Sequence, residues 1–337
     1  MKKFEVTIRC TSYNQVDYIL DALKSFVMQE TTFPFLILIV DDASTDGTAQ
    51  IVRQYVENEL DKNESQNSWQ VSTEYYDNIF AQHHVNKNCY ILSMNLKRNL
   101  YHDQLKKQSL FAPWIQCSKY IAMCDGDDYW VDRHKLQKQV DFLESHSDYQ
   151  LIFHNAICHQ QDGSQPDWIM CQFPTGDFGL KEVFEYWQLP YASVLVRETI
   201  YEHPAYKELI KKVQGGWCWF IIAAQVGKVY GVSECMSVYR KNAGGVSNGM
   251  SLDFVIEANY KFAYAVGVDV AINAIDNKVR DILVRHYREY LKGNPCVKKA
   301  METAMKYNRR MSMYVLWDYI KHLPKALFVK LTSKEPK

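Results

Sequence analysis

The sequence lacks several features that would place a protein at once in a broad class. It has no apolar run of about 18 residues, so no membrane-spanning helix is expected. The nine cysteines form no Cys-x-x-Cys pair, and the start, Met1-Lys2-Lys3 followed by a strand pattern, lacks the apolar core of an export signal. Scattered thiols without an export signal are typical of the reduced cytoplasm, which is therefore the expected location.

Internal repeats, low-complexity tracts and a net charge are absent too. The 39 Lys/Arg balance the 39 Asp/Glu, so the chain as a whole is not an obvious nucleic-acid binder. Its 337 residues, 47% apolar and 23% charged, have the composition of a globular protein with room for one domain and a half. The charge is uneven, because residues 278–337 carry 15 Lys/Arg and 5 Asp/Glu, a net of +10, against −10 for residues 1–277.

The first 56 residues show the order strand, polar turn, helix, strand, acidic turn, helix. Residues 4–10 alternate as a strand, and Asn14 is expected to cap a helix from Gln15 to about Gln29. The continuous apolar run 35–40 is typical of a strand buried on both faces, and residues 49–56 follow as an amphipathic helix. This order predicts two parallel strands joined by a right-handed crossover.

Two acidic segments directly follow apolar runs. Asp41 and Asp42 stand at the carboxyl end of a predicted strand, where open α/β sheets bind ligands. Residues 125–128 supply three carboxylates after the apolar run 120–123, and such a cluster is costly to bury unless it is paired or binds a metal. It predicts a hard cation, Mg or Mn, which usually brings phosphate with it. The alternative is a polar loop that begins a helix.

The remaining core segments give weaker signals. Residues 58–70 are polar and are expected to form a loop. Residues 134–143 carry apolar side chains on one helical face, and residues 151–154 have the pattern of another strand.

Taken together, these segments resemble the family 2 glycosyltransferases over about residues 4 to 250. The matching segments are Ile8–Asn14, Val40–Thr48, Lys119–Leu143, Phe153–Asn155 and Glu234–Arg240 with Gly244–Val246. The resemblance implies a GT-A fold, an α/β domain with a Rossmann-like, mixed and mostly parallel sheet flanked by helices. It also implies sugar transfer, with inversion, from a nucleotide diphosphate donor that is often UDP-linked. A dinucleotide site is less favoured, because no Gly-x-Gly-x-x-Gly follows the first strand.

The resemblance also implies roles for individual residues. Tyr13 and Asp42 would contact the nucleotide base, Asp125 would lie near the ribose or donor sugar, and Asp127 would coordinate the metal that bridges the diphosphate. The nucleotide-sugar site as a whole would comprise Ser12, Tyr13, Asn14, Asp41, Asp42, Ser44, Asp125, Asp127, Asp128 and Arg240. Ser44, with Asp46 and Thr48, has helix capping as an alternative role.

The sequence departs from the family where the catalytic base is expected. An inverting displacement needs a base to accept the acceptor hydroxyl proton, and in this branch the base is usually an Asp between a Gly and a Trp. That position is Gly216 here, and the usual His two residues after the Arg is Asn242. The catalytic base is therefore unassigned, and restoring it as Gly216→Asp is expected to raise turnover. Trp217 and Trp219 could line an acceptor site, with core packing as the alternative. His154 could contact the donor or the acceptor, with a hydrogen-bonded buried histidine as the favoured alternative.

The segment 251–337 is predicted to be a helical extension of the 1–250 glycosyltransferase domain. Basic residues stand beside apolar and aromatic ones from Met311 to Lys330, which suits an interfacial helix on an anionic membrane. The alternative is a helical hairpin packed on the catalytic domain.

The sequence therefore predicts a metal-dependent glycosyltransferase of the hexosyltransferase type that acts in surface polysaccharide biosynthesis. The donor is expected to be a UDP-sugar and the acceptor a glycan or lipid-linked molecule, at the inner face of the plasma membrane. The alternatives are a nucleotide-sugar binding protein without efficient catalysis, favoured by Gly216, and a nucleotidyltransferase. The latter should carry a Gly-rich basic loop after the first strand, and Thr11–Asn14 is not such a loop.

Overall fold

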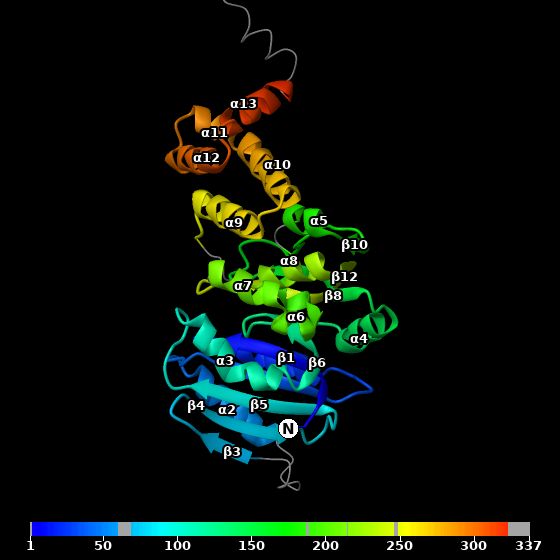
Figure 1. The fold of residues 1–337 in the computed structure, drawn as a ribbon. Helices are drawn as coiled ribbons and strands as arrows, with labels where there is room; N and C mark the ends of the chain where they lie inside the picture. The colour runs from blue at the N-terminus through cyan, green and yellow to red at the C-terminus, as the bar shows by residue number, and fades with distance from the viewer. Residues whose placement is uncertain (1, 60–68, 187–188, 214, 246–248, 323–337) are drawn as a thin grey trace, which may run out of the picture. The chain divides into compact units, whose positions relative to one another are not determined.

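The computed structural model describes residues 2–59, 69–186, 189–213, 215–245 and 249–322, which form two compact units (Figure 1). One unit comprises residues up to 179 together with 188–210 and 214–242. The other comprises residues 180–187, 211–213 and 243 onward. The second unit thus takes short segments from within the region that the sequence assigns to the catalytic domain.

The first unit is built on a mixed sheet whose central strands are parallel. The strands are β1 (Phe4–Ser12), β2 (Phe35–Asp41), β3 (Trp69–Ser72), β4 (Tyr76–Gln82), β5 (Cys89–Leu96), β6 (Ser118–Met123), β7 (Tyr129–Trp130), β8 (Tyr149–Gln160), β9 (Trp168–Ile169), β10 (Gly176–Phe178), β11 (Leu195–Arg197) and β12 (Lys228–Lys241). They are ordered β10-β12-β8-β11-β6-β1-β2-β5-β4-β3, with β7 beside β12 and β9 beside β8. β6, β1, β2 and β5 are mutually parallel, as are β8 and β12, whereas β3, β4, β10 and β11 run antiparallel to their neighbours.

Helices cover both faces of this sheet. They are α1 (Ile19–Val27), α2 (Thr48–Glu59), α3 (Gln104–Ile115), α4 (Lys135–Ser145), α6 (Thr199–Glu202), α7 (Pro204–Lys212) and α8 (Trp217–Val226), with the 3₁₀ turn η2 (Tyr191–Ser193). β2 is buried along its whole length, as its continuous apolar run predicts. The predicted fold class, a mixed α/β sheet flanked by helices, is confirmed.

The two faces of β1 differ in character. Val6, Ile8 and Cys10 are fully buried in a cluster that includes residues of α1, α2 and α4. Because side chains alternate along a strand, Thr7 and Arg9 lie on the opposite face. Thr7 donates to the carbonyl of Trp114 in α3, which lies beside β1 and β6 in Figure 1.

The prediction that Asn14 caps the first helix is wrong. The helix begins at Ile19, after a turn in which the amides of Tyr18 and Ile19 both donate to the carbonyl of Gln15. Asn14 adopts a left-handed conformation, with φ 52°, and its side chain accepts a hydrogen bond from the amide of Thr45 instead. Most of the polar segment 58–70 lies outside the described residues.

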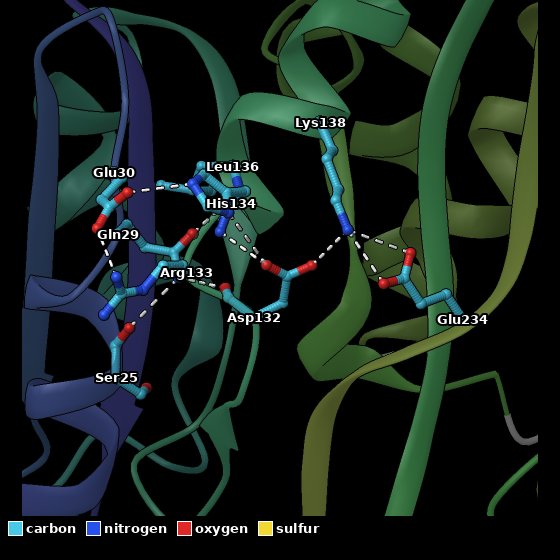
Figure 2. Close-up of polar contacts among 9 residues, drawn as sticks. All are labelled: Ser25, Gln29, Glu30, Asp132, Arg133, His134, Leu136, Lys138 and Glu234. Atoms are coloured by element: carbon cyan, nitrogen blue, oxygen red, sulfur yellow. Dashed lines mark hydrogen bonds and ion pairs between the residues drawn. The ribbon is translucent and has the colours of Figure 1, made fainter.

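Polar contacts fix the segment that follows the acidic residues 125–128 (Figure 2). The side-chain amide of Gln29, just after α1, donates to the backbone carbonyl of Asp132. It also accepts from the backbone amide of Leu136 at the start of α4. Lys138 then bridges Asp132, at 2.6 Å, and Glu234 of β12, at 3.0 Å. The start of α4 is therefore tied to both α1 and β12.

The second unit is helical. It contains α5 (Leu180–Glu185), α9 (Leu252–Val266), α10 (Asp269–Arg285), α11 (Tyr287–Leu291), α12 (Pro295–Tyr307) and α13 (Met311–Lys321). α10 packs against α5, α9 and α13, while α12 packs against α9. No helix within the described residues is both long and apolar enough to cross a membrane.

Candidate functional site

The two acidic segments meet at the carboxyl end of β1. Ser12 is paired in register with Asp41 at the end of β2, and the amide of Asp42 donates to the carbonyl of Ser12. On the other side of β1, the amide of Gly126 donates to the carbonyl of Thr11. A Cβ at position 126 would lie 2.5 Å from the Gln15 side chain, so the absence of a side chain there permits this close approach. The parallel order β2-β1-β6 thus brings both predicted loops to one edge of the sheet.

In the first loop, Asp41 organises the backbone. Its carboxylate accepts hydrogen bonds from both the amide and the hydroxyl of Ser44, at 2.9 and 2.5 Å. The Ser44 hydroxyl in turn accepts from the amide of Asn14. Asp46 accepts from the amide of Thr48 at the start of α2, as the capping alternative predicts, and also from the amide of Val16. These contacts join the turn after β1 to the loop after β2.

Asp42 is less exposed to solvent than expected for a residue that contacts a nucleotide base. Only 2% of its surface is exposed, and its carboxylate is held by the Leu100 amide at 2.7 Å and the Lys107 ammonium at 2.8 Å. Tyr13, by contrast, is 48% exposed at the same edge. Lys107 lies on α3, a helix for which the sequence gives no clear pattern, so its pairing with Asp42 could not be predicted.

In the second loop the three carboxylates point to different partners. Asp125 accepts from the Thr11 hydroxyl at 2.5 Å, Asp127 from the Asn242 side-chain amide at 3.0 Å, and Asp128 from the Arg240 backbone amide at 2.9 Å. Burial is the largest influence on all three and raises the pKa of each, and repulsion from Asp127 raises the pKa of Asp125 and Asp128 further. Asp127 stays partly exposed, whereas Asp128 is buried.

Asp127 therefore fits the predicted metal ligand. It is partly exposed, as is Asp125, and it offers the carboxylate oxygen that Mg²⁺ and Mn²⁺ prefer. The three carboxylates do not converge on one point as a ready-made cage. A metal held by one carboxylate would complete its coordination with ligands such as phosphate oxygens and water.

Another cluster, Glu59 with His83 and His84, is the one group of three potential ligands that converge in the described part of the chain. His83 Nδ1 accepts from the amides of Val85 and Asn86, at 3.2 and 2.9 Å, so its proton is on Nε2. That nitrogen lies 3.2 Å from Glu59 Oε2. A metal would need the lone pair of Nε2, so the backbone contacts of Nδ1 argue against a metal bound at His83.

Arg240 is held at the site by aromatic rings. Its guanidinium lies 4.9 Å from the centre of the Tyr18 ring and 5.0 Å from that of Tyr129, and it pairs with Asp21 of α1 at 2.9 Å. Its Nε has no hydrogen-bond partner among the described residues. The Arg240 guanidinium, predicted to belong to the nucleotide-sugar site, thus lies near the acidic loop. Its contacts with the two aromatic rings could not be predicted from the sequence.

Gly216 lies immediately before α8, as predicted, but a side chain there has no room. A Cβ would lie 2.3 Å from Cδ2 of Tyr191 in η2 and 2.6 Å from its Cε2. Gly216 itself has φ −59°, so the obstacle is steric rather than conformational. The expectation that Gly216→Asp alone restores a base overlooked Tyr191, which the sequence could not place beside residue 216.

Two of the other candidate residues belong to the core. Trp219 is buried and its ring lies 4.6 Å from that of Tyr206, so the packing alternative holds. His154 is fully buried, and its Nδ1 lies 2.7 Å from the carbonyl of Asn155. Burial lowers the pKa of His154 well below its ordinary value, which keeps the ring neutral.

Comparison with known proteins shows which families and folds this chain is similar to. Residues 8–70 match the family described as Glycosyl transferase family 2. The protein Rv1520 of Mycobacterium tuberculosis, named as uncharacterized, is 28% identical over 248 residues, which are 72% of this chain and 60% of that protein. TuaG of Bacillus subtilis, named for a glycosyltransferase of teichuronic acid biosynthesis, is 25% identical over 247 residues, 72% of this chain and 81% of that protein. This chain thus spans about 60% of the length of its mycobacterial relatives.

Solved structures share the fold at low identity. Residues 1–349 of TarS from Staphylococcus aureus, in complex with UDP, superpose with a TM-score of 0.56 at 15% identity, covering 94% of this chain and 89% of TarS 1–349. A complex of the same TarS segment with UDP-GlcNAc gives a TM-score of 0.51 at 16% identity, covering 96% of this chain and 82% of that segment. The resemblance to the family and the GT-A fold are both confirmed.

Proposed function

Because the chain resembles the family 2 glycosyltransferases in sequence and has their GT-A fold, we propose that it transfers a sugar from a UDP-sugar to a glycan or lipid-linked acceptor. The observation that carries this proposal is the meeting of the two acidic loops at the end of β1. UDP is chosen because the fold neighbour TarS binds UDP and UDP-GlcNAc. Polysaccharide assembly as the setting is supported by the name of TuaG.

In this proposal the chain's own residues hold the donor in place. Tyr13 binds the base, while Asp42, held by Lys107 and the Leu100 amide, fixes the loop beside it. The loop built by Asp41 and Ser44 faces the nucleotide, and Asp125 positions the donor sugar. Asp127 holds Mg²⁺ or Mn²⁺, which would offset the charge that gathers on the departing diphosphate. Arg240, held between two aromatic rings, adds a second positive charge near the acidic loop.

The test is calorimetric titration of UDP and of GDP, each with and without Mn²⁺, into wild type and Asp127→Asn. We expect metal-dependent binding of UDP that falls at least tenfold in the variant. Asp141→Asn, an exposed carboxylate on α4, is the matched control and should bind as wild type. If wild type does not bind UDP in any condition, the proposal is contradicted.

A second candidate function is nucleotide-sugar binding without efficient transfer. It is favoured by one observation, the Tyr191 ring in the space where a residue 216 side chain would lie. Removing a general base costs about 10²–10⁴-fold in rate. Release of UDP from UDP-GlcNAc, in the presence of a mixture of candidate acceptors, separates the two functions, because a binding protein would retain donor affinity with no release above background.

We also propose that α13 docks on an anionic membrane surface, which would bring the enzyme to a lipid-linked acceptor. Met313 and Trp317 on this helix are 67% and 61% exposed, and Leu316 is exposed beside them. The Lys321 ammonium lies 5.3 Å from the centre of the Trp317 ring, and Arg309 and Arg310 are exposed just before the helix. Apolar and basic residues in one place suit the headgroup region of anionic lipid. The predicted continuation through Lys325 and Lys330 lies outside the described residues.

Co-sedimentation with phosphatidylglycerol vesicles, compared with phosphatidylcholine vesicles, tests this docking. We expect wild type to sediment with the anionic vesicles and Met313→Ser/Trp317→Ser to lose most of that binding. Val85→Ser, which removes an exposed aliphatic side chain from the first unit, should bind as wild type. Equal sedimentation of wild type and the double variant would contradict the proposal.

A further inference from the structure

Arg9 is an unusual residue for the middle of a central strand. Its neighbours Ile8 and Cys10 are fully buried on the α1 side, whereas Arg9 lies on the α3 side of β1. Its guanidinium carbon is 4.9 Å from the centre of the Phe111 ring of α3. Arg9 is partly exposed to solvent, whereas its Nε atom is buried. The guanidinium is therefore partly buried rather than fully exposed.

The Nε of this guanidinium is buried and has no hydrogen-bond partner among the described residues. Arg197, another partly buried arginine on the sheet, behaves differently: it donates to the carbonyls of Tyr149, at 2.7 Å, and Leu143, at 2.6 Å. An arginine held only for structure is satisfied in this way, and Arg9 is not.

The surroundings of Arg9 place it beside the donor site. Asp125 interacts with it electrostatically, although the Asp125 carboxylate is hydrogen-bonded to the Thr11 hydroxyl. Arg9 thus lies on the same face of β1 as Thr11, two residues further on, whose hydroxyl donates to Asp125.

Lys107, the other buried cation of this face, is already neutralised. Its ammonium is 2.8 Å from Asp42, and both side chains are almost fully buried. Arg9 is left as a cation of this face whose buried Nε has no partner among the described residues. A buried charge without a partner is costly, and such groups are typical of sites where an oppositely charged ligand completes the pairing.

We propose that Arg9 binds an anionic group, a carboxylate or phosphate, carried by one of the substrates close to the transferred sugar. A guanidinium recognises either group through paired N–H donors. The anion can come from the donor, as the carboxylate of a uronic acid, or from the acceptor, as a phosphate or carboxylate near the accepting hydroxyl. This inference rests on the proposed function and narrows its substrates to charged ones.

Binding measurements on wild type, Arg9→Met and Arg9→Lys distinguish the two sources. The donor arm compares UDP-glucuronate with UDP-glucose, and the acceptor arm uses inorganic phosphate, with and without saturating UDP. We expect one anionic probe to bind wild type at least tenfold more tightly than Arg9→Met, with Arg9→Lys intermediate. UDP itself should bind all three proteins within about twofold.

Control variants keep the outcome interpretable. Arg53→Met removes an exposed arginine that pairs with Glu57 on α2 and should bind every probe as wild type. Arg9→Met should melt no lower than wild type, because it replaces an unpaired charge with an apolar side chain of similar length. If the Arg9 variants lose affinity for UDP and for the anionic probes equally, Arg9 only balances the charge of Asp125 and the proposal is wrong. The proposal is also wrong if the affinity for neither anionic probe depends on Arg9. Failure of wild type to bind UDP would instead count against the donor site, since the phosphate arm without UDP still tests Arg9.

Discussion

At the scale of single residues, Lys135 is the most heavily buried charge of the first unit. It is fully buried at the start of α4, where its ammonium donates to the Gln139 side chain at 2.7 Å and lies 4.0 Å from the centre of the Trp130 ring. Burial lowers the pKa of Lys135 to about 7. The folded protein therefore releases this proton at a pH where the unfolded chain still holds it.

This shift predicts a rise of stability with pH. Between pH 7 and about pH 10 the unfolded state binds one more proton at Lys135 than the folded state, so the free energy of unfolding increases by up to about 1.4 kcal/mol per pH unit. Lys135→Met removes this dependence. Urea unfolding of both proteins at pH 7, 8 and 9 measures it, and a difference between wild type and variant that stays constant across those pH values would contradict the assignment.

At the scale of elements, η2 and α8 meet where the Tyr191 ring lies beside Gly216. Gly216→Asp is expected to destabilise the fold by about 1–3 kcal/mol, because its Cβ overlaps the Tyr191 ring. In a Tyr191→Ala background the same change should be much better tolerated, and the double variant should release UDP from UDP-GlcNAc faster than either single variant. Gly216→Ala separates the overlap from the added charge. The cycle is measured by urea unfolding, and additive effects would show that the two positions do not interact.

The elements that the sequence predicts well are those whose apolar pattern is local. β2, β6 and α4 match the predicted segments 35–40, 120–123 and 134–143 to within a few positions. Apolar runs and the apolar face of a helix can be recognised in the local sequence, without knowledge of the segments they pack against. Contacts between distant segments are not visible in this way. Asn14 bonds to Thr45, 31 residues away, rather than capping its own helix. Likewise Lys107 neutralises Asp42 across 65 residues, and Tyr191 closes the space at Gly216.

At the scale of the whole molecule, the C-terminal helices form a unit that also includes a segment from earlier in the chain. α5 belongs with them, since its Val183 and Phe184 are fully buried and α5 packs against α10. The predicted boundary at residue 250 falls close to the division at residue 243, but it leaves α5 on the other side. A catalytic role for the first unit alone stays a prediction.

A fragment that ends at Asn242 is therefore expected to aggregate or to melt well below the full chain, because α5 loses α10 and exposes its apolar face. Phe184→Ser should improve the solubility of the fragment while lowering the melting temperature of the full chain. Light scattering and thermal unfolding of both lengths provide the measurement. A fragment that is monomeric and as stable as the full chain would show that α5 needs no C-terminal partner.

The pairing of α5 with α10 also sets an order for synthesis of the chain. From Glu185 to Asp269 there are 84 positions, so α5 leaves the ribosome long before the helix that covers it. At about 5–20 residues per second, α10 begins to emerge roughly 4–17 s later. During that interval α5 lacks its packing against α10, so its apolar side chains Val183 and Phe184 are expected to be available to chaperones. Codon choice between these two helices would then influence the yield of folded protein without changing any residue.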